Sequence, residues 1–399
     1  MNEPQDPSRN RQPPPDATPE WVAATADRAA EDRAPPPSKI RRALPWLAAS
    51  AVVVTLAVTV ATRWLGPEPP FAELDLGGRP VAARLIVLPF ANATGNPAND
   101  WVSTGLAEMV AATLERTPGV SIASSERLQG VIAARGLDPG DPIGRDRIRE
   151  LALALGAELT LEARFRHGSN RPNAADAVAA DFQIFDADGQ QAEGTVKGTD
   201  FLEAGDRLAF SVARGLVSGH VPVRLSAAYS RDPFADRLYA MGLHQLRTAG
   251  ADVAAPYFEI ALRSRPAFLQ AKVRLAECAE LDSDLTRAGD LAREVLEQAR
   301  GRGEQHFQAW SLRALGRLAI REGRLENAQE NYSQAFSIVL GADDAGTRAD
   351  LMFELARLAL IRGATGRAEE LFIETLQIRQ DQNDRLGEVD ALLEIASLF

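Results

Sequence analysis

The sequence predicts a disordered tail, one transmembrane helix, an α/β domain with a mixed sheet, and an all-α superhelix of stacked helix pairs. Residues 235–399 repeat one pattern of small and large apolar residues in a register that holds four times. Residues 43–62 carry no charge, and a helix of that length spans about 30 Å, the thickness of a bilayer core. These patterns divide the chain into a tail at 1–42, a membrane helix at 43–65, a linker at 66–82, an α/β domain at 83–220 and repeats at 233–399.

The first part of the chain predicts a single membrane crossing. Residues 1–38 hold nine prolines and few large apolar side chains, so they cannot bury enough apolar surface to offset their conformational entropy. Lys39, Arg41 and Arg42 precede the apolar run, whereas only Arg63 follows it closely. The positive-inside rule then predicts a bacterial inner-membrane protein with a cytoplasmic N-terminus and periplasmic C-terminal domains. A cleaved signal peptide and a buried soluble helix are the alternatives for this run.

The α/β domain is predicted from alternating apolar and turn segments. Strands are expected at 83–89, 120–123 and 158–165, with a hairpin at 178–185 and 191–198, and helices at 100–116, 125–134, 143–155 and 202–216. The first of these strands is almost continuously apolar, as in a strand buried on both faces of a sheet. The loop at 92–99 joins a strand to a helix, where open α/β sheets hold ligands, but its one glycine also fits an ordinary connection.

The start of this domain carries a family resemblance. Leu85-Ile86-Val87-Leu88-Pro89-Phe90, with Gly105-Leu106 some fifteen residues later, is similar to a periplasmic domain family related to the N-terminal domain of TolB. The resemblance covers roughly 83–217. It implies a domain that follows a single membrane helix, as in bacterial winged-helix regulators, receptor kinases and cyclases. This chain departs from those regulators because no output domain precedes the predicted membrane helix.

Small residues at fixed positions predict four helix pairs after residue 233. Counted from Ala235, Leu269, Ala309 and Ala349, the eighth residues are Gly242, Ala276, Gly316 and Ala356, and the twenty-fourth are Phe258, Ala292, Tyr332 and Phe372. Glycine or alanine lets two helix axes approach closely, and larger residues fill the grooves beside them. The pattern resembles the tetratricopeptide repeat, which implies a tetratricopeptide superhelix that binds other chains.

The spacing of the repeats changes along the chain. The first two repeats are 34 residues apart and the later ones 40, as in kinesin-light-chain-like arrays with longer helices. A fifth repeat begins near Val389, reaches its eighth position at Ala396 and stops at Phe399. Because its apolar residues lack a covering helix, we expect either a fragment of a longer protein or an open face that docks on something, including a second copy.

Composition narrows the classes of function. The net charge of −11 argues against a general nucleic-acid binder, since phosphate requires a basic surface. The four histidines are scattered, and neither a Gly-x-Ser-x-Gly elbow nor a phosphate loop occurs. We therefore expect no metal, no cofactor and no enzymatic activity, unless a catalytic part lies beyond residue 399 or in the 92–99 loop. Cys278, the one cysteine, is expected to pack in the interior or to lie on the surface without a reactive role.

The candidate partner-binding site lies on the concave face, which the resemblance assigns to the first helix of each repeat. Its residues are Tyr239, Leu243, Trp310, Arg313, Arg317, Arg321, Phe353 and Arg357. Arg313, Arg317 and Arg321 recur every four residues, so they share one helix face. Arginine forks beside aromatic surface suit an acidic or C-terminal peptide. The alternative is a solvated face in which these arginines pair with acids such as Glu322 and Glu326.

The sequence thus predicts a membrane-anchored periplasmic scaffold that binds protein or peptide partners through its repeats. The alternative is a sensory or regulatory component of a bacterial transmembrane signalling system.

Overall fold

The computed structural model describes residues 84–398, except 118–119, 124, 137–142, 169–176, 187–188, 217–228 and 343–344. The predicted tail, membrane helix and linker at 1–82 lie outside these residues. Residues 71–399 cluster as one compact unit, which contains both the sheet domain and the helical array. The predicted boundary between those two at 220–233 stays a prediction.

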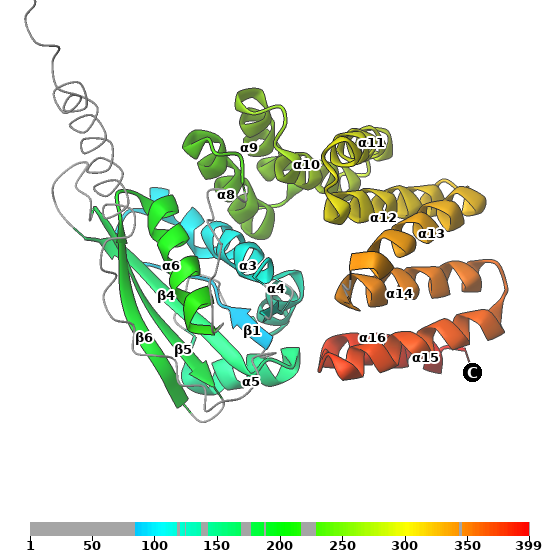
Figure 1. Cartoon of the computed structure of the whole chain (residues 1–399), viewed down its shortest axis with the longest axis horizontal. Coiled ribbons are helices and arrows are strands. Elements are labelled where there is room, and N and C mark those ends of the chain that lie inside the picture. The colour runs from blue at the N-terminus through cyan, green and yellow to red at the C-terminus, as the bar shows by residue number, and fades with distance from the viewer. Residues whose placement is uncertain are drawn as a thin grey trace, which may run out of the picture. The chain divides into compact units, whose positions relative to one another are not determined.

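The sheet domain is built on a mixed sheet, as predicted, and the sheet has six strands where five were expected, because the short strand β2 was not foreseen (Figure 1). The strands are β1 (Arg84–Val87), β2 (Ala91–Asn92), β3 (Ser121–Ile122), β4 (Leu159–His167), β5 (Val178–Asp186) and β6 (Gly189–Gly198). Their order is β3-β1-β4-β5-β6, and β2 also pairs with β4. β1 runs parallel to β3 and β4, whereas β4, β5 and β6 are antiparallel.

Helices cover both faces of β1, which explains its continuous apolar run. The helices of this domain are α3 (Ala107–Glu115), α4 (Ser125–Ala134), α5 (Arg145–Leu155) and α6 (Phe201–Leu216). Leu85 and Val87 point into the core shared with α3 and α6. Ile86 and Leu88 point into the opposite core, against α4 and α5. The alternation follows from the two-residue period of a strand.

The predicted helix at 100–116 differs from the expectation at its start. A π-helical segment, η2 (Val102–Leu106), precedes α3. Gly105 lies in this segment, and a β-carbon there would overlap the carbonyl oxygen of Ala240 in the array. The wide turn thus brings backbone against backbone, which only glycine permits.

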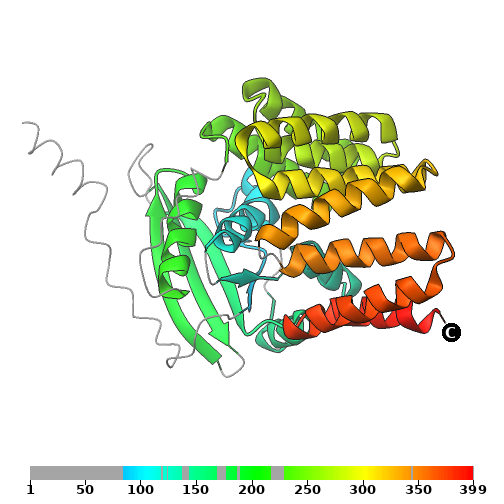
Figure 2. The same ribbon diagram turned by 45° about the vertical axis from the view of Figure 1, so that its right-hand side comes forward.

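The array consists of antiparallel helix pairs in the predicted register (Figures 1 and 2). Its helices are α8 (Pro233–Thr248), α9 (Ala251–Ser264), α10 (Leu269–Leu281), α11 (Leu285–Arg302), α12 (Gln305–Arg321), α13 (Leu325–Ala342), α14 (Ala345–Ile361), α15 (Thr365–Asp381) and α16 (Arg385–Ala396). A β-carbon on Gly242 would lie 2.6 Å from the Phe258 ring, and Gly316 lies under the Tyr332 ring in the same way. The prediction of a tetratricopeptide-like superhelix is confirmed by this packing.

The structure contradicts the membrane-spanning part of the predicted fold class. Among the residues listed above as described, no helix is both long and apolar enough to cross a bilayer. The longest helices, α11 and α13, expose Arg293 and Glu326, because only one face of each packs into the core. The transmembrane fold class and the single-pass inner-membrane localisation are therefore not retained.

Candidate functional site

The first helices of neighbouring repeats are joined by ion pairs along one face of the array. We call α8, α10, α12, α14 and α16 the A helices. The Arg317 guanidinium of α12 donates to both carboxylate oxygens of Glu280 in α10, with Nη2 at 2.9 Å and Nε at 3.4 Å. On the other side, Arg313 Nη1 donates to Asp350 Oδ2 of α14 at 2.9 Å. The arginine spacing of α12 thus connects three successive repeats.

Two further predicted arginines on this face are exposed and loosely held. Arg321 Nη1 donates to the backbone carbonyl oxygen of Glu280 at the long distance of 3.4 Å. Arg357 Nε lies 3.9 Å from Glu394 Oε1 of α16, with 55% of the Arg357 side chain exposed. These two guanidiniums can therefore turn towards an incoming carboxylate with little loss.

The predicted alternative named the wrong acids. Glu322 pairs with Arg324, and Glu326 pairs with Arg362 at 3.1 Å, so neither contacts the arginines of α12. The true partners lie one repeat away, where the superhelix brings A helices together.

The predicted aromatic residues contribute to the core as well as to the surface. Trp310 is half-buried against the cluster that contains Val295 and Phe307. Phe353 is also half-buried, and its ring centroid lies 5.3 Å from that of Phe372.

Tyr239 and Leu243 are placed in the core instead of on an open groove. Their exposed fractions are 5% and 1%, and they belong to a cluster that continues into α3 and α6 of the sheet domain. Tyr239 packs between aromatic rings, with the Phe268 centroid at 5.1 Å. The first repeat therefore uses these side chains to attach the array to the sheet domain.

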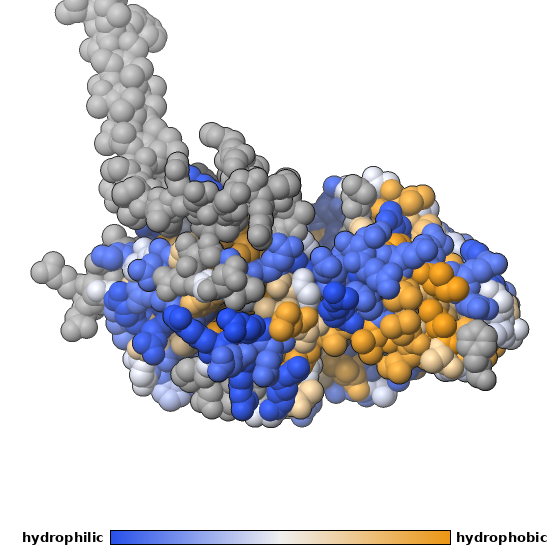
Figure 3. Space-filling view, turned by 90° about the horizontal axis from the view of Figure 1, so that it is seen from below, coloured by the Kyte–Doolittle hydropathy of each residue, from blue (hydrophilic) through white to orange (hydrophobic). Residues whose placement is uncertain are grey.

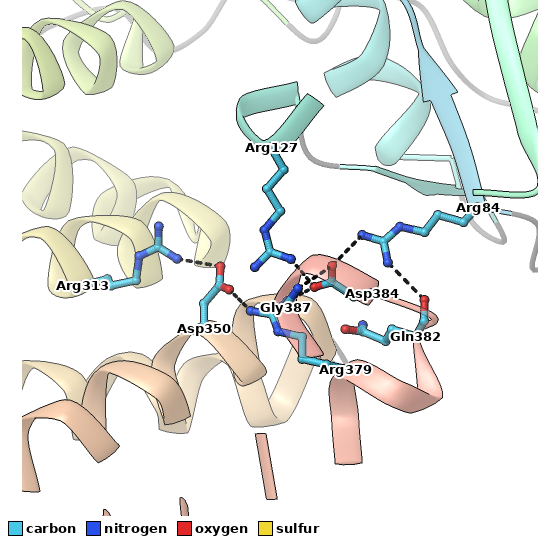
Figure 4. A network of polar contacts seen from close by, with 8 residues as sticks. All are labelled: Arg84, Arg127, Arg313, Asp350, Arg379, Gln382, Asp384 and Gly387. Carbon is cyan, nitrogen blue, oxygen red and sulfur yellow. Dashed lines mark hydrogen bonds and ion pairs between the residues drawn. The ribbon is translucent and has the colours of Figure 1, made fainter. Parts of the chain in front are cut away.

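The series of ion pairs along the A helices ends at the buried carboxylate of Asp384, which was not predicted from the sequence (Figure 4). Asp350 contacts Arg379 of α15, and Arg379 Nη1 lies 2.8 Å from Asp384 Oδ2. Arg127 of α4 pairs with the same carboxylate, and Arg84 of β1 approaches it at 3.8 Å. Only 1% of the Asp384 side chain is exposed. Asp384 also caps the N-terminus of α16, where its carboxylate accepts a hydrogen bond from Gly387 N at 3.2 Å.

We call Asp384 and the three arginines around it, Arg84, Arg127 and Arg379, the node. The electrostatics of the node favour the charged form of the Asp384 carboxylate. Burial opposes the ionisation of Asp384, but the guanidiniums of Arg127 and Arg379 outweigh burial, so its pKa is lowered. Burial also lowers the pKa of Arg84, against the attraction of Asp384. Arg84 Nη1 in addition donates to the Gln382 carbonyl oxygen at 3.0 Å. The last repeat is thereby fixed to β1 and α4.

The first repeat is fixed by the reciprocal arrangement. Here the sheet domain supplies the carboxylate, Glu108 of α3, which is 6% exposed. Arg247 Nε of α8 lies 2.7 Å from Glu108, and Arg274 Nη2 of α10 lies 3.7 Å away. Thr104 Oγ1 and His244 Nδ1 lie 2.8 Å apart beside this pair. The array is thus attached to the sheet domain at both of its ends.

The 92–99 loop uses its polar side chains internally. Asn92 Nδ2 donates to Asp100 Oδ1 at 2.7 Å, and Asn99 Nδ2 donates to Thr94 Oγ1 at 3.1 Å.

In the part of the chain that the structure describes, no three His, Cys, Asp or Glu side chains gather as metal ligands.

Comparisons with known proteins found only distant likenesses among solved structures. No protein-family model and no curated protein matches the chain. BtubC from P. vanneervenii is 15% identical over 42% of this chain and 74% of its own, with a TM-score of 0.38. The apo form of RapI is 14% identical over 46% and 65% (TM-score 0.36), and a putative kinesin light chain from Podosopora anserina with TPR-like repeats is 16% identical over 45% and 88% (TM-score 0.32). Such distant likenesses carry no information about partners, and the TolB-like resemblance stays an expectation.

Proposed function

We propose that the chain is a non-enzymatic protein-interaction scaffold that binds an acidic peptide, or an acidic segment of a partner protein, along its A helices. The arginines gathered along the A helices support this proposal. Four arginines lie on the A helices, Arg313, Arg317, Arg321 and Arg357, and three more, Arg84, Arg127 and Arg379, surround Asp384 at the end of this face. These seven arginines are gathered in a chain whose net charge is −11. We call these seven residues the arginine ladder.

The carboxylates already held by the ladder support the chemistry. The Arg317 guanidinium donates two hydrogen bonds to the Glu280 carboxylate. This bidentate geometry is the one by which arginine binds a carboxylate most strongly. Arg321 and Arg357 offer the same donors with weaker partners, at 3.4 Å and 3.9 Å. Because exposed ion pairs contribute only about 0–1 kcal/mol, an incoming carboxylate can replace such a partner. Trp310 and Phe353 would supply apolar contact beside the exchanged charges.

A peptide titration with a matched control tests the proposal. The probe is a fluorescein-labelled oligoglutamate peptide, compared with oligoglutamine of the same length, and binding is followed by anisotropy. Two charge-reversing changes on the ladder, Arg321→Glu with Arg357→Glu, are compared with Arg293→Glu and Arg367→Glu. The last two residues are 61% and 62% exposed on second helices, away from the ladder.

We expect saturable, salt-sensitive binding of the acidic peptide to the unchanged protein. The ladder variant should bind about tenfold more weakly or worse, because two attractive contacts of up to about 1 kcal/mol each are replaced by repulsive ones. Equal loss in the control variant, equal binding of oligoglutamine, or no saturable binding would each refute the proposal. The sensory or regulatory alternative stays a prediction, since no described residue forms an output domain for it.

A further inference from the structure

The hydroxyl group of Tyr332 lies near two arginines of α12. The Tyr332 side chain belongs to α13, and it is fully buried. Its ring crosses α12 at Gly316, where a β-carbon would lie 2.9 Å from the ring carbon that carries the hydroxyl. Arg313 stands one turn before Gly316, and Arg317 directly follows it. The charges of both arginines act on the hydroxyl, so it lies where α12 is paired with α14.

Two buried donors at this place have no partner. Among the residues that the structure describes, neither the Tyr332 hydroxyl nor Arg313 Nε makes a hydrogen bond. Arg313 donates to Asp350 of α14 through Nη1, as Figure 4 shows. A buried donor left unpaired lowers stability, so native structures nearly always pair such groups. The two donors thus indicate that this place receives a group that accepts hydrogen bonds.

The Tyr332 hydroxyl acts as a donor at neutral pH. Burial raises the pKa of the hydroxyl above its ordinary value, and the charge of Glu354 adds to this effect. The arginines nearby favour the charged phenolate but do not outweigh burial. Because the proton stays on the oxygen, the hydroxyl can donate to an anion. An apolar side chain would satisfy neither donor, although the array also exposes hydrophobic surface, as the view from below shows (Figure 3).

The arginines at this place already have acidic partners. Arg313, Arg317 and Arg357 pair with Asp350, Glu280 and Glu394, at 2.9 Å, 2.9 Å and 3.9 Å. Glu354 of α14 is a fourth acid, and its charge acts on both Arg317 and Tyr332. Glu354 is half-buried and makes no hydrogen bond to a described residue. Because acids outnumber arginines here, a further carboxylate can enter only where an acid leaves, and Glu354 has no hydrogen bond to lose.

We propose that Tyr332 is a specificity-determining residue, whose hydroxyl binds one carboxylate of the acidic ligand between α12 and α14. The ligand carboxylate takes the position of Glu354, which turns into solvent. It accepts hydrogen bonds from the Tyr332 hydroxyl and from Arg313 Nε. Arg357, with 55% of its side chain exposed and its acid 3.9 Å away, turns towards the same carboxylate. The inference rests on the function proposed above, and it identifies the residue that positions one charge of the ligand.

Two conservative substitutions in the full chain test this inference, each with a matched control. Tyr332→Phe removes the hydroxyl, and Tyr257→Phe makes the same change at a half-buried tyrosine of α9. Glu354→Gln removes the negative charge, and Glu369→Gln makes the same change at a half-buried glutamate of α15. Binding of the fluorescein-labelled oligoglutamate peptide is followed by anisotropy at two salt concentrations. Urea unfolding of each variant is recorded without peptide.

We expect Tyr332→Phe to bind the peptide about tenfold more weakly, as for the loss of one hydrogen bond to a charged group. The dependence of binding on salt should be unchanged, because phenylalanine removes a donor but no charge. Glu354→Gln should bind the peptide about threefold more tightly or better, because it no longer repels the ligand carboxylate. The two controls should bind like the unchanged protein.

Without peptide, Tyr332→Phe should unfold at the same urea concentration as the unchanged protein or at a higher one. The reason is that its hydroxyl has no partner among the described residues, so its removal costs no hydrogen bond. Unfolding at a lower urea concentration would overturn the inference, because the hydroxyl would then have a partner inside the protein.

The binding data separate this inference from the proposed function. If Arg321→Glu with Arg357→Glu loses binding while Tyr332→Phe binds like the unchanged protein, the proposed function stands and the role of Tyr332 is overturned. If the unchanged protein does not bind oligoglutamate, both are overturned. Binding by Glu354→Gln that is no tighter than that of the unchanged protein would contradict the displacement of Glu354.

Discussion

Replacing Gly156 by alanine measures how closely the last repeat packs on the sheet domain. Gly156 ends α5 with φ of 61°, and a β-carbon there would overlap the carbonyl oxygen of Asn383, in the loop before α16. Real β-carbons essentially never come within 3.0 Å of another atom, so the loop has to retreat. The retreat would pull Gln382 away from Arg84 and Asp384 away from its guanidiniums.

The expected loss in the free energy of unfolding of Gly156→Ala combines two effects. Alanine in the left-handed region costs about 1–2 kcal/mol. Breaking a buried ion pair such as that of Asp384 costs about 3–5 kcal/mol. Gly136→Ala is the matched control, because Gly136 also has φ of 61° but a β-carbon there meets nothing within 4 Å. The control should therefore show the backbone effect alone.

Urea unfolding, followed by circular dichroism, gives the two free energies of unfolding. We expect Gly156→Ala to lose about 3 kcal/mol or more beyond the loss in Gly136→Ala. Equal losses in the two variants would refute the reasoning, because they would mean that the α15–α16 loop does not press on Gly156.

Three further predictions concern buried groups elsewhere in the chain. Cys278 is fully buried in α10 and burial raises the pKa of its thiol to about 12, so we expect no reaction with a disulfide reagent until urea unfolds the protein. Burial lowers the pKa of His244 below 6.5, so stability should be lost as the pH falls from 6.5 through the folded pKa. The free energy of unfolding of His244→Gln, measured at pH 6.5 and at a more acidic pH, should fall less than that of the unchanged protein. An equal fall in the two proteins would contradict this. Glu108→Gln leaves Arg247 without a charged partner at a buried site and should lower the free energy of unfolding by about 3 kcal/mol, and a loss within error of zero would argue against the observed pairing.

The helix pairs could be predicted because their signal is local. Gly316 and Tyr332 stand at fixed positions of a repeat, and the same packing recurs wherever the register does. The buried strand β1 could be predicted for a related reason, since Leu85 and Ile86 face two cores and both must be apolar. The transmembrane part of the predicted fold class was wrong, because no helix among the described residues is both long and apolar enough to cross a bilayer.

The site was predicted less well because its contacts are distant in sequence. Helix periodicity placed Arg313 and Arg317 on one face, but their acids lie 37 residues away in both cases, one repeat along the array. The resemblance to the tetratricopeptide repeat put Tyr239 on the concave face without indicating that Tyr239 shares a core with the sheet domain. The Arg84–Gln382 contact spans 298 residues, so no local pattern could reveal that the last repeat returns to β1.

Hydrogen exchange in Asp384→Asn tests most directly that the sheet domain holds the array at both ends. Asparagine keeps the cap of α16 but removes the charge that Arg84, Arg127 and Arg379 surround. A loss of about 3 kcal/mol corresponds to about a hundredfold faster exchange of amides in α16. We predict this increase in α16 and no change in α8, with Asp390→Asn, an exposed position on the same helix, exchanging like the unchanged protein. Unchanged protection of α16 in Asp384→Asn would contradict the account.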